Sequence, residues 1–182
     1  MQPTASAATP ARPAEVPAPA ATLPDILKER TMDLHMSAER HAFHRAMFKG
    51  EASWQAYLEQ TAQTLLVQDA LERALRAGLG RSAALVAVVR EHHFRAGMIR
   101  EDLKACGLDP TSIAPLHATR AMLSTIERDA GGDPAALLGA MYVLEGSTNG
   151  AKFIKTALQR AYAKSDDTGL KWLDPHGEQL RE

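Results

Sequence analysis

The hydrophobic pattern is helical from residue 23 onward, because apolar side chains recur at every third or fourth position. In the first predicted helix this repeat falls on four residues: Leu27, Thr31, Leu34 and Ala38. Gly50 ends this unit, since glycine readily adopts the left-handed conformation that closes helices. The second predicted helix starts at Trp54, stops before Gly78, and carries one apolar stripe: Trp54, Leu58, Leu65 and Leu75.

A third helix is predicted over about 82–105, because the same period continues through the whole range. The run 86–89 is apolar enough for a strand, but the sustained period favours a helix. The sequence from Gly107 to Pro110 breaks the pattern, and a shorter helix follows through 120–126.

Gly131 and Gly132 end that shorter helix. Asp133 and Pro134 then predict the N-cap and first turn of a last long helix. Neither an internal repeat nor a strand–turn–strand pattern occurs in the sequence. We therefore expect an all-α fold, with one domain of about five to seven helices over residues 23–182.

The first 22 residues differ in composition from the rest of the chain, because they are mostly Ala, Pro and Thr. Prolines interrupt every apolar stretch, so the segment lacks the continuous apolar core of a signal peptide. We expect residues 1–22 to form a disordered tail with polyproline II character and no chemical role.

Charge and cysteine usage exclude several classes of function. The 182 residues carry a net charge of −1 with scattered basic residues, which argues against nucleic-acid binding. No apolar run is long enough to span a membrane. The single cysteine, Cys106, allows no internal disulfide, which fits a reducing cytoplasm. A phosphate-binding loop and a dinucleotide fingerprint are also lacking, so we expect no NADPH site.

Two glycines interrupt the last predicted helix between flanks that favour helix. Gly146 and Gly150 lie one turn apart, and each destabilises a helix interior by about 0.8–1 kcal/mol relative to alanine. One interpretation is close packing against another helix through small residues. The other is that bare backbone faces a flat ligand or lets the helix bend. The spacing alone favours the packing interpretation.

Two motifs in the chain resemble those of the heme oxygenases. The first is the pattern L-K-E-x-T-x-x-x-H-x-x-x-E, which runs from Leu27 to Glu39 and contains His35. The second is Y-V-x-E-G-S-x-x-G, which runs from Tyr142 to Gly150 in the form of bacterial members. Both occur in the family's order, and the similarity extends over about 23–163. The resemblance implies the heme oxygenase fold and a heme-degrading activity.

The resemblance makes His35 the proximal ligand of a heme iron, with Glu39 one turn later to strengthen it. Without the motif, a lone helical histidine is more often a packed or surface residue, and Glu39 could be an ordinary surface partner. Lys28 and Tyr142 match positions that hold heme propionates in bacterial relatives, because both side chains donate to carboxylates. For Lys28, a solvated helix face is an equally good interpretation.

Gly146 and Gly150 match the distal glycines of the family, whose bare backbone lies on the porphyrin face and directs oxidation to one ring edge. Ser147, which belongs to the same predicted catalytic set, and Thr148 could hold water that supplies protons. Helical hydroxyls more often bond the preceding turn, so both interpretations stay open. The remaining histidines lack the partners of a closed metal site: His41, His44, His92, His93, His117 and His176.

Two departures from the family pattern affect the predicted pocket. Asn149, Ala151 and Lys152 differ from the residues that are common at the end of the second motif. In addition, the chain ends at Glu182, where the family's closing helix would begin. We therefore expect a fold without that final helix, in which a partner or a second protomer, as in a homodimer, could close the pocket.

The resemblance implies an enzyme for which heme is both substrate and cofactor. It would use dioxygen and electrons from a ferredoxin or flavoprotein reductase, and would release biliverdin, carbon monoxide and ferrous iron. A non-catalytic heme carrier or sensor on the same fold is the alternative, which the altered 149–152 edge would suit. A third class is a helical interaction domain without heme, in which replacing His35 would change no ligand-dependent property.

Overall fold

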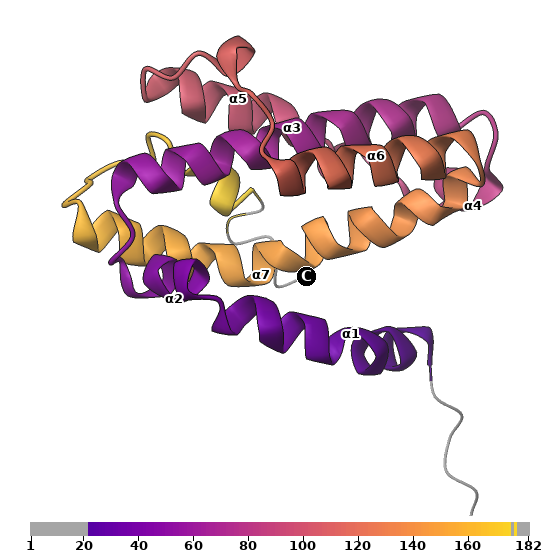
Figure 1. The fold of residues 1–182 in the computed structure, drawn as a ribbon, viewed down its shortest axis with the longest axis horizontal. Helices are drawn as coiled ribbons and strands as arrows, with labels where there is room; N and C mark the ends of the chain where they lie inside the picture. The colour runs from indigo at the N-terminus through magenta and orange to yellow at the C-terminus, as the bar shows by residue number, and fades with distance from the viewer. Residues whose placement is uncertain (1–21, 176, 178–182) are drawn as a thin grey trace, which may run out of the picture. The chain divides into compact units, whose positions relative to one another are not determined.

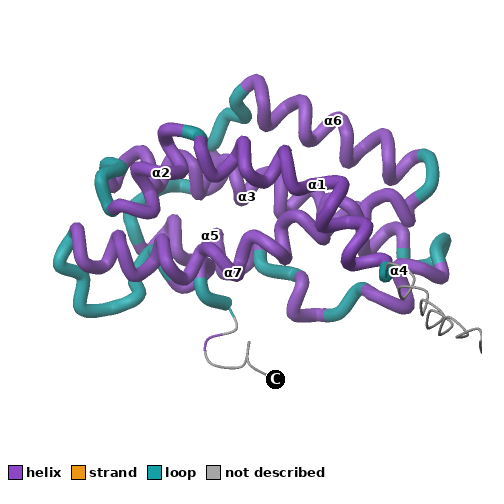
Figure 2. Tube along the Cα trace, turned by 90° about the horizontal axis from the view of Figure 1, so that it is seen from below, coloured by secondary structure: helices purple, strands orange, loops and turns teal. Residues whose placement is uncertain are grey.

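The computed structural model describes residues 22–175 and 177, and every regular element in this part of the chain is helical (Figure 1). The α-helices are α1 Leu23–Arg40, α2 Ala42–Lys49, α3 Trp54–Gly78, α4 Ala83–Val88, α5 Ala96–Ala105, α6 His117–Gly131 and α7 Leu137–Ala161. Short 3-10 turns cover Glu91–His93, Pro110–Ser112, Pro134–Ala136 and Lys171–Leu173. Figure 2 shows these helices joined by short loops. The all-α prediction is confirmed, and none of the described helices is long and apolar enough to cross a membrane.

The chain divides into two compact units, residues 1–39 and residues 40–182. The described part of the first unit is Thr22 and helix α1 up to Glu39. The Thr22 hydroxyl and main-chain N–H donate to the Asp25 carboxylate at 2.6 and 3.0 Å, which caps the helix start. These two hydrogen bonds lower the pKa of Asp25. Residues 1–21 of the predicted tail lie outside the described part, as does the predicted loss of a closing helix, whereas Thr22 caps α1.

The second unit is built around α3, which packs against α5 and α6. One apolar cluster lies between α2, α3, α5 and the end of α7, and it contains the fully buried Tyr57, Leu103 and Leu158. A second cluster joins α3 to α4, α6 and the start of α7 around Leu71 and Leu137. Helix α7 borders both clusters, so the core fixes its course at each end.

The segment after α7 folds back onto α3 and α5. The Tyr57 hydroxyl donates to the Gly169 carbonyl at 2.6 Å and accepts from Trp172 Nε1 at 3.0 Å. The Trp172 main-chain N–H donates to the Asp102 carboxylate at 2.9 Å. Gly169 has a φ of +80° and lies against Cys106, where a Cβ would overlap Sγ. Burial raises the pKa of Tyr57, so its hydroxyl remains a donor and anchors this segment.

The predicted single helix over 82–105 is wrong, because α4 ends at Val88 and α5 begins at Ala96. The buried Glu72 carboxylate of α3 accepts the main-chain N–H groups of Arg95 and Ala96 at 2.5 and 2.6 Å. The first N–H groups of a helix have no intrahelical partner, so a carboxylate bound there fixes a new helix N-terminus. The apolar period does not reveal this tertiary contact.

The boundaries of the other helices agree better with the sequence. The first predicted unit does end at Gly50, but it consists of α1 and α2, separated at His41, whose backbone is extended. Helix α7 is preceded by the predicted cap, in which the Asp133 carboxylate accepts the Ala135 N–H at 2.9 Å. The capped turn leads directly into the helix that carries the two glycines.

Candidate functional site

Helix α7 has one exposed and one buried face. Successive residues advance about 100° around a helix, so Tyr142, Gly146, Gly150 and Phe153 fall on the same side, with Val143 at its border. Tyr142 is 44% exposed, and Val143 and Phe153 are each 61% exposed. The opposite face enters the core through six residues: Leu137, Met141, Thr148, Ala151, Ile154 and Leu158. The second unit therefore presents an apolar strip of α7 with the glycines inside it.

The surface at Gly146 is open. No described atom of the second unit lies within 4 Å of a Cβ placed at this glycine. At Gly150 the nearest atom is Phe48 Cζ of α2, at an ordinary contact distance of 3.6 Å. At Gly78, by contrast, a Cβ would come within 2.7 Å of Leu85 Cδ1. Packing inside this unit thus explains Gly78 but not Gly146, whose backbone is accessible to a flat ligand.

The two hydroxyls beside Gly146 bond the preceding turn. Ser147 Oγ donates to the Leu144 carbonyl at 2.7 Å, and Thr148 Oγ1 donates to the Glu145 carbonyl at 2.8 Å. Ser147 is exposed, whereas Thr148 is buried. Because both hydroxyl protons already bond carbonyl oxygens, these hydroxyls can only accept a hydrogen bond from a water molecule. The structure favours the helical interpretation of these side chains over direct proton delivery.

Sequence reasoning missed a residue beneath this turn, Arg95. Its side chain is only 8% exposed, and Nη2 lies 3.1 Å from the Leu144 carbonyl oxygen and 3.4 Å from Glu145 Oε2. The apolar period placed Arg95 inside a continuous helix, where an arginine is unremarkable on a polar face. Its contacts with Leu144 and Glu145 arise only in the tertiary fold.

Helix α1 carries the other predicted residues on one face. Lys28, His35 and Glu39 are separated by seven and four positions, which brings them to the same side of the helix. His35 Nδ1 lies 3.7 Å from Glu39 Oε1, and the two side chains are 65% and 48% exposed. A carboxylate beside Nδ1 favours the tautomer that carries its proton there and leaves Nε2 as the metal-binding nitrogen. Lys28 is exposed.

The structure thus groups the predicted residues within two elements: Lys28, His35 and Glu39 on α1, and Tyr142, Gly146, Ser147 and Gly150 on α7. Other histidines have local structural contacts. His93 Nδ1 accepts the Arg90 N–H at 3.0 Å, and its ring contacts that of His92. Within the described residues, no group of three or more His, Cys, Asp or Glu is placed to hold a metal ion.

Each unit, taken by itself, has residues that suit one part of a flat, apolar ligand with a metal at its centre. Gly146 offers space that a side chain would fill, and Val143 and Phe153 offer apolar surface beside it. An exposed imidazole is a type of donor that binds porphyrin iron, and His35 presents one with its Nδ1 3.7 Å from a carboxylate oxygen.

Comparisons with known proteins agree with these features. The heme oxygenase family model matches residues 21–180. The heme oxygenase of Leptospira interrogans has a similar structure, with a TM-score of 0.75 and 24% identity over 81% of this chain and 73% of that chain. Heme oxygenase-1 of the cyanobacterium Synechocystis sp. PCC6803, in complex with heme, is also similar. Its TM-score is 0.74, with 21% sequence identity, over 81% of this chain and 67% of that chain. No curated protein sequence matches.

Proposed function

This chain belongs to the heme oxygenase family, and on that premise we propose that it cleaves heme to biliverdin, carbon monoxide and ferrous iron. The observation that carries the proposal is the open backbone at Gly146 within the exposed apolar strip of α7. Bound heme supplies the iron at which dioxygen is reduced, and it is itself the substrate that is opened. The protein binds and orients the ring.

His35 binds the iron in this proposal through Nε2. Glu39, whose Oε1 lies 3.7 Å from Nδ1, is the carboxylate that orients the imidazole in this proposal. Both side chains are exposed, so the imidazole is accessible to an incoming ring. Lys28, on the same face of α1, provides the cation for a propionate.

The α7 strip contacts a face of the ring in this proposal. Gly146 and Gly150 let the helix backbone lie against the porphyrin in this proposal, since a Cβ at Gly146 would enter open space and one at Gly150 would lie 3.6 Å from Phe48 Cζ. Phe153 and Val143 contribute apolar contact, and the Tyr142 phenol donates to a propionate. Ser147 remains in the proposed catalytic set only as an acceptor for ordered water, because its proton is bonded to Leu144.

Electrons for the reaction come from a ferredoxin or a flavoprotein reductase in this proposal, since the sequence offers no dinucleotide fingerprint. We place the activity in the cytoplasm, where a free cysteine such as Cys106 persists. A homodimer is a further part of this proposal, and analytical ultracentrifugation with and without heme tests it.

The function is tested by titrating the protein with hemin, following the Soret band, and then adding ascorbate under air. We expect stoichiometric binding and conversion to a biliverdin-like spectrum. His35→Ala should lose the histidine-ligated Soret band, and added imidazole should restore it. His117→Ala, an exposed histidine on α6, is the matched control and should behave like the unmodified protein.

The outcomes separate the classes of function. Ligation by His35 without ring opening would indicate a heme carrier or sensor instead of an enzyme. If hemin produced no spectral change, the result would indicate a helical interaction domain that does not bind heme. A Soret band that His35→Ala leaves unchanged would show that another residue binds the iron.

A further inference from the structure

Arg95 lies where the chain leaves its 3-10 turn Glu91–His93 and enters α5. The position is fixed by α3. Glu72 Oε1 accepts the Arg95 and Ala96 N–H groups at 2.5 and 2.6 Å, and it also accepts Gln68 Nε2 at 3.0 Å. The Glu72 side chain is 6% exposed. A buried carboxylate with three donors holds the Arg95 backbone rigidly against α3.

The Arg95 side chain then extends from this anchored backbone to α7. Nη2 donates to the Leu144 carbonyl at 3.1 Å and lies 3.4 Å from Glu145 Oε2. These two contacts fall on the residues directly before Gly146. Arg95 therefore links α3 and the start of α5 to the turn of α7 that exposes Gly146 on its outer side.

The Leu144 carbonyl has a second side-chain donor, because Ser147 Oγ bonds it at 2.7 Å. Side-chain donors on a helical carbonyl compete with the backbone ladder and bend or loosen a helix locally. Gly146 adds backbone freedom in the same turn. The course of α7 at this turn thus depends on the contacts made to it from the buried side.

The charges in this cluster are paired. Burial lowers the pKa of Arg95, while Glu145 and Glu72 act in the opposite direction and keep the guanidinium charged. Removing the cation would leave the buried Glu72 and the half-buried Glu145 without it. Lysine would keep the charge but not the planar guanidinium whose Nη2 contacts both the Leu144 carbonyl and the Glu145 carboxylate.

We propose that Arg95 is a positioning residue that sets the place of the Gly146 turn of α7 from the core side, and so selects which edge of a bound heme is opened. Arg95 touches neither ring face in this proposal; it acts through Leu144 and Glu145. The consequence for ring opening rests on the proposed function, whereas the effect on α7 does not.

The test compares Arg95→Lys and Glu145→Gln with the unmodified protein. In the heme-free state, hydrogen–deuterium exchange of amides in 144–150 should accelerate by roughly tenfold or more in Arg95→Lys, because a charge-assisted bond to that turn is lost. Glu145→Gln keeps the Leu144 bond and should show a smaller acceleration. In the hemin-loaded protein, the proportions of the biliverdin regioisomers should change in the same order.

Arg100→Lys is the matched control. Arg100 lies on α5, five residues after Arg95, and pairs with Asp69 of α3 at 2.9 Å, but this pair does not include α7. Equal exchange in Arg95→Lys and Arg100→Lys would overturn the proposal. Faster exchange with unchanged regioisomers would overturn the link to ring opening. Failure of the proposed function would appear separately, as an unmodified protein without a Soret band, and the exchange comparison would still decide the role of Arg95.

Discussion

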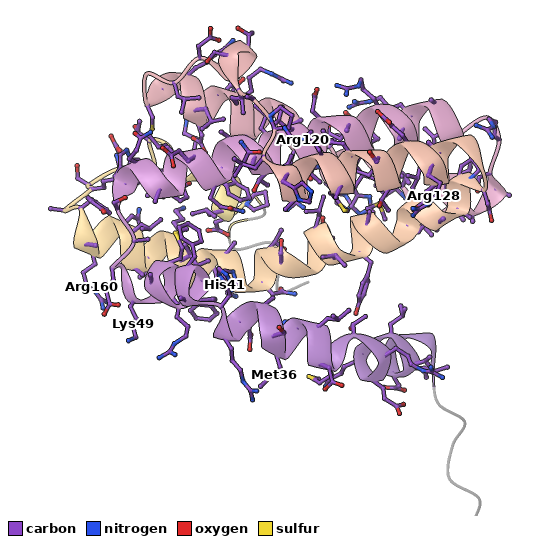
Figure 3. All side chains as sticks on the ribbon, viewed as in Figure 1. Met36, His41, Lys49, Arg120, Arg128 and Arg160 are labelled. Carbon is purple, nitrogen blue, oxygen red and sulfur yellow. The ribbon has the colours of Figure 1, made fainter. Side chains whose placement is uncertain are left out.

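The two halves of helix α7 are held in different ways. The half from 151 to 161 is packed closely, because Gly50, which follows α2, approaches it so nearly that a Cβ would lie 2.9 Å from the Ala157 carbonyl oxygen. Lys155 Nζ also bonds Asp167 of the following segment at 2.9 Å. Figure 3 shows the labelled Lys49 of α2 and Arg160 of α7 at the same end of this unit.

The half from 137 to 150 has its front exposed at Tyr142, Val143 and Gly146. It is held from behind by a few apolar side chains, such as Leu137, and by the polar contacts of Arg95. Hydrogen bonds to a backbone carbonyl hold a helix without covering its other face. The closely packed half therefore anchors the helix, and the half with the glycines keeps a surface free for a ligand.

The largest effect is expected in the packed half. Leu158 is fully buried, so Leu158→Ala should lower the free energy of unfolding by about 2–5 kcal/mol. Val143→Ala, at a 61% exposed position in the other half, should change it by less than about 0.5 kcal/mol. Urea denaturation followed by circular dichroism measures both. Similar losses in the two variants would contradict the proposed difference between the halves.

A smaller loss is expected at the contact between α2 and α7. Gly50 has a φ of +70°, and its Cβ would meet the Ala157 carbonyl and lie 3.0 Å from Ala161 Cβ, so Gly50→Ala should destabilise by about 1–3 kcal/mol.

Gly107→Ala separates the two causes of that loss. Gly107 has a φ of +79° but no described atom within 4 Å of its Cβ position, so this variant measures backbone strain alone. The difference between the two melting temperatures gives the effect of the close contact. If Gly107→Ala lowers the melting temperature as much as Gly50→Ala does, the α2–α7 contact contributes nothing to stability.

The same contrast shows what the sequence can reveal. The 3.6-residue period predicts the helices and the buried face of α7, because that pattern records local geometry. The sequence does not distinguish three glycines of the second unit. Neighbouring atoms leave no room for a Cβ at Gly50 and Gly78, whereas no described atom of this unit lies near the Cβ position of Gly146. Only the fold distinguishes them.

The buried polar contacts were the least predictable part of the molecule. Glu72 and Arg95 lie 23 residues apart, and Tyr57 and Gly169 lie 112 apart. No local period reports such pairs. The motifs on α1 and α7 named seven site residues by resemblance, but Arg95 lies outside both motifs and becomes visible only through its contact with Leu144.

The smallest change in stability is expected at Gly146, where it should have the opposite sign. Because no described atom of the second unit lies near its Cβ position, Gly146→Ala should stabilise the heme-free protein by up to about 1 kcal/mol through helix propensity. In the proposed function the added methyl occupies the space of the ring, so hemin binding should weaken or its Soret band should shift. Gly139→Ala, also open on α7, is the matched control for propensity and should leave the Soret band unchanged. Destabilisation by Gly146→Ala would mean that this glycine is a packing position after all, and the two halves of α7 would then differ only in degree.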